Sequence, residues 1–142
     1  MHAGDFSKLW FKINREIKVH LEEQLGPTLT EGQLNVLEYM FVNAPVKPSD
    51  LIDYLATTPA AVTTLLDRME KAELIERQRD DQDRRIVWIR MTEKGDLEGR
   101  RGMQIKSSFV QSCLDRISTH NQQLLVFLLG KVCTNEEVAV TD

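Results

Sequence analysis

The sequence has few of the residues that mark specialised protein classes. Its 142 residues include only two cysteines, four prolines and 6% aromatic residues. Two widely separated cysteines are too few for a disulfide framework or a zinc cluster, so we interpret Cys113 and Cys133 as reduced, unreactive core residues. With 42% hydrophobic and 28% charged residues, the composition excludes a disordered chain and is typical of a globular domain that favours helices.

Long hydrophobic runs are also missing. The longest strongly apolar run, residues 124–129, falls far short of the roughly 20 residues that a membrane-spanning helix needs. The first 25 residues alternate charged and apolar positions and lack the continuous apolar region of a signal peptide. We therefore expect a single domain over residues 1–142, located in the cytoplasm.

The residue patterns of enzymes are absent as well. The three histidines, His2, His20 and His120, show no metal-ligand spacing. The sequence contains no glycine-rich phosphate loop, nucleophile elbow or paired-carboxylate motif. We predict neither catalysis nor a bound metal or other cofactor.

Charge is unevenly distributed along the chain. The formal net charge of −4 by itself argues against a polyanionic partner, because affinity for DNA comes largely from neutralised phosphates. Between Arg84 and Arg101, however, six basic residues outnumber three acidic ones. The distribution therefore leaves a local basic region that suits a nucleic acid.

Apolar periodicity predicts a long helix at the start of the chain. Residues 5–25 carry apolar side chains at steps of three and four, and Gly26 follows them. Thr30 and Gln33 have the capping-box spacing that opens a second helix, and this helix must end before Pro45.

Two shorter helices follow. Pro48 suits the first turn of a third helix, and Thr58 followed by Pro59 has the pattern of a cap and first residue of a fourth. Two short helices joined by a tight turn predict a helix-turn-helix.

The periodicity then changes from helical to alternating. Residues 74–79 and 85–91 are rich in β-forming residues, and the polar segment between them predicts a solvated hairpin tip. Thr92 is placed to cap a fifth helix from Glu93 to about residue 117, with Leu97, Ile105, Phe109 and Leu114 along it. The predicted fold is mainly α with a small β-hairpin wing.

A sixth predicted helix, opened by Ser118, is apolar nearly all round. Such a helix must be buried on all sides, which is difficult at the end of a small domain. We infer that it packs against the first helix of a second copy, since two-fold dimers are the commonest soluble oligomers. Residues 1–44 and 93–142 then form a helical dimerisation region, and residues 45–92 form a separate lobe.

The fourth predicted helix exposes short side chains on one side. These are Thr57, Thr58, Ala60, Ala61, Thr63, Thr64 and Arg68. A helix that enters the major groove of DNA needs such residues near its amino end, where hydroxyls reach base edges or phosphates and methyl groups contact thymine. Taken alone, threonines on an exposed face are more often simply solvated.

The predicted hairpin tip places Arg84 and Arg85 beside Asp83. A carboxylate can hold one guanidinium in a fixed direction, and arginine suits a narrow, electronegative minor groove. A surface ion pair without function is the alternative for an isolated motif of this kind. Its position just after a helix-turn-helix favours the DNA interpretation.

Three segments stand in a characteristic order and spacing: LDRMEKAELIER at residues 66–77, DDQDRR at 80–85 and MTEKG at 91–95. Together they resemble the multiple-antibiotic-resistance repressor (MarR) family. The resemblance implies a winged helix-turn-helix dimer with its long N- and C-terminal helices at the interface. It also implies that the fourth helix occupies the major groove and the hairpin wing the minor groove of double-stranded DNA.

The resemblance assigns roles by position. Arg85 is similar to the family's minor-groove arginine, Asp83 to its orienting carboxylate, and Arg84 and Arg68 to phosphate contacts. Two residues depart from the pattern. Glu73 stands where the family usually has the glycine of a left-handed helix cap, which puts that cap in doubt, and Asp81 replaces a usual proline, which is expected to loosen the wing.

Many members of the family bind a small aromatic or anionic effector between the dimer helices and the DNA-binding lobe. By this resemblance, Trp10, Phe11, Tyr39 and Phe41 are candidate lining residues, although aromatics at helical spacing usually belong to the core. Some members sense peroxide through a cysteine in the first helix, and this chain has none there.

Two hypotheses of function follow. The first is a ligand-responsive repressor that binds a near-palindromic operator as a homodimer, with half-sites roughly one helical turn apart. The second is a winged-helix dimer that binds another protein instead of DNA. The overall acidity of the chain and the wing residues Asp80, Asp81 and Asp83 slightly favour it.

Overall fold

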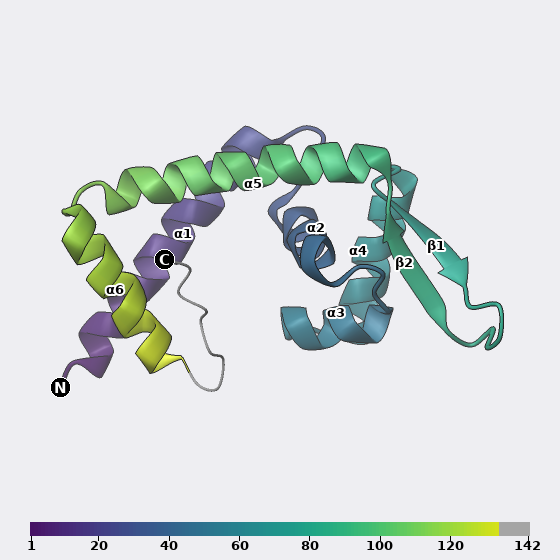
Figure 1. The fold of residues 1–142 in the computed structure, drawn as a ribbon, viewed down its shortest axis with the longest axis horizontal. Helices are drawn as coiled ribbons and strands as arrows, with labels where there is room; N and C mark the ends of the chain where they lie inside the picture. Colours follow the sequence, from purple (N-terminus) through teal and green to yellow (C-terminus); the bar gives the residue numbers. More distant parts are fainter. Residues whose placement is uncertain (134–142) are drawn as a thin grey trace. The chain divides into compact units, whose positions relative to one another are not determined.

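The computed structural model describes residues 1–133, and Figure 1 shows its arrangement of helices with one β-hairpin. The elements are α1 (Ala3–Leu25), α2 (Glu31–Asn43), α3 (Pro48–Leu55), α4 (Pro59–Lys71), β1 (Ile75–Arg79), β2 (Val87–Met91), α5 (Glu93–Leu114) and α6 (Thr119–Val132). The chain divides into two compact units, Met1–Ser107 and Ser108–Asp142. The first contains both the helix-turn-helix and the hairpin.

Local capping sets the helix starts that the sequence predicts. The Thr30 hydroxyl accepts a hydrogen bond from the Gln33 N–H at 3.2 Å, and the Gln33 side chain accepts one from the Thr30 N–H at 3.1 Å. The predicted capping box of α2 is therefore confirmed. Thr58 caps α4, and Ser118 caps α6, in each case by accepting from the backbone N–H three residues later.

The hairpin is antiparallel, with Ile75 opposite Met91 and Arg79 opposite Val87. Its second strand begins at Val87, two residues later than predicted, because the Ile86 N–H donates to the Asp83 carbonyl and closes the turn. The other side of the second strand is bonded to Val46, which both donates to and accepts from Ile89. These bonds fix the hairpin to the segment that leads into α3.

The core of the first unit lies between α2, α3, α4 and the hairpin. Its most buried side chains include Leu34, Leu37, Met40, Leu51, Val62, Leu66, Met69, Leu74, Ile75 and Ile89. Burying this apolar surface supplies the main driving force for folding the lobe. In Figure 1, α2, α3 and α4 lie below the amino-terminal half of α5, with the hairpin beside α4.

Helix α5 packs against the core through glycine rather than through leucine. Its buried residues are Gly95, Gly99 and Gly102, whereas Leu97 is 63% exposed. A Cβ at Gly99 would lie 2.6 Å from the ring of Phe41, and one at Gly102 would lie 2.7 Å from Leu34. The absence of side chains therefore lets α5 lie directly against α2.

The second unit presents an apolar surface on α6. The exposed large hydrophobic residues of this helix are Leu124, Leu125, Val126, Phe127, Leu128 and Val132. The expectation that both cysteines belong to the core is wrong in the single chain, since Cys133 is exposed and Cys113 only half-buried. Both lie where the end of α5 and α6 leave much of their surface uncovered. Among the described residues, no helix is both long and apolar enough to span a bilayer.

Candidate nucleic-acid interface

Helix α4 has one buried and one exposed face. Val62, Leu66 and Met69 point into the core of the first unit. The turn before the helix passes through Ala56, whose φ of 49° is left-handed, and the Ala56 N–H donates to the Ile52 and Asp53 carbonyls. This tight turn places the amino end of α4 at the surface.

The exposed face of α4 carries the residues that the sequence singles out. The structure exposes all of Thr57, Thr58, Ala60, Ala61, Thr63, Thr64 and Arg68. Two of the hydroxyls turn back on the helix: Thr63 donates to the Pro59 carbonyl at 3.0 Å, and Thr64 donates to the Ala60 carbonyl at 3.1 Å. Back-bonding of this kind satisfies the hydroxyl proton within the helix.

The hairpin tip holds Arg85 in a fixed orientation. Its Nε lies 3.0 Å from Asp83 Oδ1 and its Nη2 lies 3.1 Å from Asp83 Oδ2, so the pair is bidentate. The Arg85 backbone N–H also donates to Asp83 Oδ1. The Arg85 side chain is nevertheless 91% exposed, which leaves the outer edge of its guanidinium open to a ligand.

The same contacts keep both groups charged. The side-chain hydrogen bond from Arg85, followed by that from the Arg85 backbone, lowers the pKa of the Asp83 carboxyl. The carboxylate in turn raises the pKa of the Arg85 guanidinium. At neutral pH the tip therefore presents an oriented cation.

Asp80, which sequence reasoning missed, organises the loop around this pair. One of its oxygens accepts from the backbone N–H groups of Gln82 and Asp83, both at 2.9 Å. The other accepts from Trp88 Nε1 at 3.0 Å, and this bond is the main reason why the pKa of Asp80 is lowered. In a sequence, an aspartate at the start of a short polar turn is the signal for such a cap, because its side chain can accept from the backbone N–H two residues later.

Further bonds support the wing despite the replacement of the usual proline by Asp81. Arg79 Nη1 donates to the Arg84 carbonyl at 2.8 Å, which connects the end of β1 to the tip. The Asp80 N–H donates to the Ile86 carbonyl at 2.9 Å. The side chain of Arg84 itself is exposed beside Arg85.

The left-handed cap after α4 is formed although glycine is absent. Glu73 has a φ of 63°, its N–H donates to the Glu70 carbonyl, and the Leu74 N–H donates to the Met69 carbonyl. This pair of bonds is the Schellman motif. The doubt raised by Glu73 is therefore removed, because this residue takes up the conformation that normally favours glycine.

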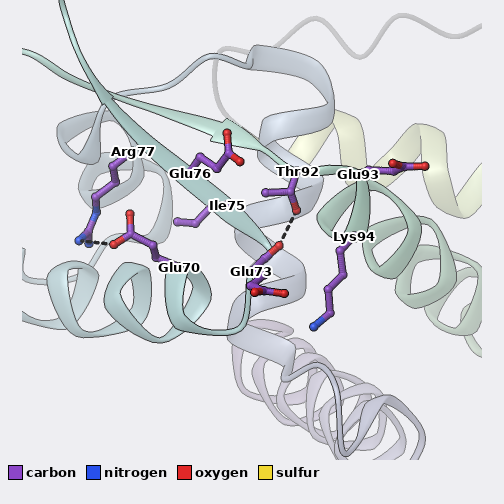
Figure 2. A pocket seen from close by; sticks show the side chains of 8 residues that line it. All are labelled: Glu70, Glu73, Ile75, Glu76, Arg77, Thr92, Glu93 and Lys94. Carbon is purple, nitrogen blue, oxygen red and sulfur yellow. Dashed lines mark hydrogen bonds and ion pairs between the residues drawn. The ribbon is translucent and has the colours of Figure 1, made fainter.

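The junction between α4, β1 and α5 surrounds a cavity of about 630 Å³ (Figure 2). It is lined by Glu70, Glu73, Ile75, Glu76, Arg77, Thr92, Glu93 and Lys94. Thr92 Oγ1 donates to the Glu73 carbonyl at 2.6 Å, and Lys94 Nζ donates to the Ala72 carbonyl at 2.9 Å. These bonds attach the start of α5 to the carboxyl end of α4.

The four candidate effector residues do not line this cavity. Tyr39 packs against Tyr54, with ring centroids 4.5 Å apart, and the Arg100 guanidinium lies over the ring of Phe41. On α1, Trp10 stacks on Phe6 and is half-exposed, while Phe11 is 70% exposed. Their role in binding an effector stays a prediction.

Comparison with known proteins gives the class of this fold. Residues 29–87 match the MarR family model. The chain is 32% identical to the HTH-type transcriptional repressor MdtR of Bacillus subtilis over 90 residues, which are 63% of this chain and 56% of that protein. The matched segment thus spans little more than half of the length of this relative.

Solved structures agree over more of the chain. A MepR–DNA complex from S. aureus is 25% identical with a TM-score of 0.78, covering 89% of this chain and 95% of that one. A mutant MarR from E. coli complexed with operator DNA is also 25% identical, with a TM-score of 0.77 and coverage of 90% and 93%. The fold is that of the winged helix-turn-helix regulators. Over residues 29–87 the chain is similar to the MarR family.

Proposed function

We propose that this protein is a transcriptional regulator that binds double-stranded DNA sequence-specifically as a homodimer. Helix α4 enters the major groove, and the tip between β1 and β2 reaches the neighbouring minor groove. Residues 1–44 and 93–142 form the dimerisation region, and residues 45–92 form the DNA-binding lobe. The operator is near-palindromic, with half-sites about one helical turn apart.

The Asp83–Arg85 pair is the observation that carries this proposal. A bidentate pair whose arginine is 91% exposed adds little to core packing, and its oriented guanidinium is available to a ligand. A guanidinium that is already oriented loses less conformational entropy when it enters a narrow, electronegative groove. The exposed small residues of α4, with its positive helix end, supply the adjacent major-groove surface.

The relatives support the same function. MdtR is a transcriptional repressor, and the MepR and MarR neighbours were solved with DNA. We propose that this chain is likewise a repressor that acts in the cytoplasm, without catalytic activity. A small aromatic or anionic effector that contacts Trp10, Phe11, Tyr39 and Phe41 would release it from the operator.

Exposed apolar residues on α1 and α6 support the dimer. Helix α1 exposes Phe6, Leu9, Trp10 and Phe11, and α6 exposes a second set of large hydrophobic residues. Apolar surface of this extent is typical of an interface between subunits.

The alternative, a winged-helix dimer that binds a protein rather than DNA, rests on the acidic residues of the wing. The carboxylate oxygens of two of them, Asp80 and Asp83, accept hydrogen bonds inside the loop. These bonds give Asp80 and Asp83 a role in organising the tip and leave Asp81 as the exposed acidic residue of the loop. This arrangement favours the DNA-binding function.

Arg85→Ala tests the proposal, with Arg90→Ala as the control. Arg90 is an exposed arginine of the same hairpin that bonds to Gln78, away from the tip. Fluorescence anisotropy on duplexes selected from a randomised library should show severe loss of affinity for Arg85→Ala and little change for Arg90→Ala. Thermal melting of both variants should match the wild type, and undiminished affinity of Arg85→Ala would falsify the wing assignment.

A further inference from the structure

The amino-terminal half of α4 presents no side chain that can make a two-bond contact with a base. Its exposed residues before Arg68 are threonine, proline and alanine, apart from Asp67. Bidentate recognition of guanine requires arginine or lysine, and recognition of adenine requires asparagine or glutamine. The residues that are placed to enter the groove first therefore carry no group for these contacts.

Three of the threonine hydroxyls on this surface are already engaged. Thr58 Oγ1 accepts from the Ala61 N–H at 3.2 Å as the helix cap. Thr63 and Thr64 donate their hydroxyl protons to the Pro59 and Ala60 carbonyls. Neither of the latter two hydroxyls has a proton free for a base, so each can only accept from a base amino group, and the γ-methyl group of each side chain forms its apolar contact surface.

From this we infer that Thr63 and Thr64 determine specificity through their methyl groups, by contact with the C5-methyl of thymine in the major groove. This inference rests on the proposed function and names the base that α4 selects. Thymine is the one base of DNA that presents a methyl group in that groove. The neighbouring methyl groups of Ala60 and Ala61 extend the same apolar, donor-free surface.

The wing favours the same kind of sequence. An arginine inserted into the minor groove prefers the narrow groove of A·T-rich DNA. Arg85, held by Asp83, is the residue placed for that contact. Both elements of the lobe thus select A·T base pairs, by two independent mechanisms.

Matched threonine variants separate the methyl group from the hydroxyl. Thr63→Val and Thr64→Val keep a methyl group and remove the hydroxyl, whereas Thr63→Ser and Thr64→Ser keep the hydroxyl and remove the methyl. We expect the valine variants to bind the selected duplex with unchanged affinity. Each serine variant should bind about 4-fold more weakly per half-site, the loss expected for one buried methyl group, or about 15-fold for the dimer.

Uracil substitution tests the DNA side of the same contact. Replacing single thymines of the selected duplex by uracil removes only the C5-methyl group. We expect one or two positions per half-site to lose about 4-fold in affinity with the wild type, and to lose nothing further with the serine variant of the contacting residue. Thermal melts of all four variants show whether any loss of affinity comes from unfolding.

Three results would overturn the inference or the function on which it rests. Weak binding by the valine variants with normal binding by the serine variants would overturn it in favour of hydroxyl recognition. A duplex that is enriched but insensitive to uracil would also overturn it, while leaving DNA binding intact. If the wild type enriched no duplex at low salt, the proposed function would fail and the methyl inference would fail with it.

Discussion

The guanidinium of Arg77 on β1 lies 2.8 Å from the Asp67 carboxylate of α4, and it also lies 3.7 Å from Glu70. Figure 2 shows Arg77 reaching from the strand toward Glu70 on the helix. The pair joins the element proposed for the major groove to the hairpin proposed for the minor groove. Its partial exposure means that it contributes little to stability, so we assign it to orientation of the two elements.

Arg77→Met should weaken DNA binding several-fold while changing the free energy of unfolding by less than about 1 kcal/mol. Methionine keeps the apolar stem of the side chain and removes the link to Asp67. A double-mutant cycle with Asp67→Asn, read by anisotropy and by urea denaturation, isolates the pair. The double variant should bind no worse than either single variant; strictly additive losses would show that the two residues act separately.

Glu73→Gly should stabilise the protein by about 0.5–1 kcal/mol. Glu73 occupies the left-handed region with a φ of 63°, where a Cβ is disfavoured and glycine is not. The cavity around this residue contains three other glutamates, so removal of charge needs a control. Glu73→Gln removes the charge and keeps the Cβ. Equal stabilisation by Gln and Gly in thermal or urea unfolding would assign the effect to electrostatics instead.

Gly95→Ala should destabilise the fold by about 3 kcal/mol or prevent folding. A Cβ at this position would overlap the Leu74 carbonyl oxygen and press on Met91. Because the obstacle is backbone, relief requires α5 to move away from the junction that Thr92 and Lys94 close. Urea denaturation at fixed protein concentration measures the loss.

Gly32→Ala is the matched control for this substitution. Gly32 is also helical, and its added Cβ would make only an ordinary contact with Leu65 at 3.8 Å. Since alanine is the better helix former, we expect Gly32→Ala to be neutral or slightly stabilising. Equal effects of the two substitutions would refute the close-packing explanation for Gly95.

Sequence reasoning located elements where the determining contacts are local. The Thr30 and Thr58 caps, Pro48 at the first turn of α3 and the Asp83–Arg85 spacing are each set within a few residues, and the structure contains all of them. The closeness of α5 to α2 was missed because it depends on which glycines meet Phe41 and Leu34 across the core. A leucine such as Leu97 fits a helical stripe in sequence, yet only packing decides which side of the helix is buried.

The candidate site also has some features that the sequence predicts and others that it does not. Exposure of the α4 residues follows from helical period, so the sequence was sufficient to predict it. The back-bonding of Thr63 and Thr64 and the bond from Trp88 to Asp80 depend on side-chain rotamers and on pairing between strands. The sequence spacing gives no access to either, because both are set by three-dimensional geometry.

Arg101 makes the stability of this protein sensitive to acid through Glu98. The guanidinium donates to Glu98 Oε2 at 2.9 Å, to the Leu25 carbonyl at 2.8 Å and to the Thr28 hydroxyl at 2.9 Å. The hydrogen bond from Arg101, with a further one from Thr28, lowers the pKa of Glu98 below its ordinary value of 4.5. The cluster joins the carboxyl end of α1 to α5.

Glu98→Gln should therefore reduce stability at neutral pH by an amount that disappears in acid. A carboxyl whose pKa is lower in the folded state contributes stability above its unfolded pKa, and this contribution is lost as the pH falls through the folded value. The difference in unfolding free energy between wild type and Glu98→Gln should be full above about pH 5 and shrink toward zero below the folded pKa. In an Arg101→Met background the Glu98→Gln difference should be small at every pH. If the difference between wild type and Glu98→Gln instead stayed constant down to acid pH, the ion pair would not be its source, and the packing of the side chain would be.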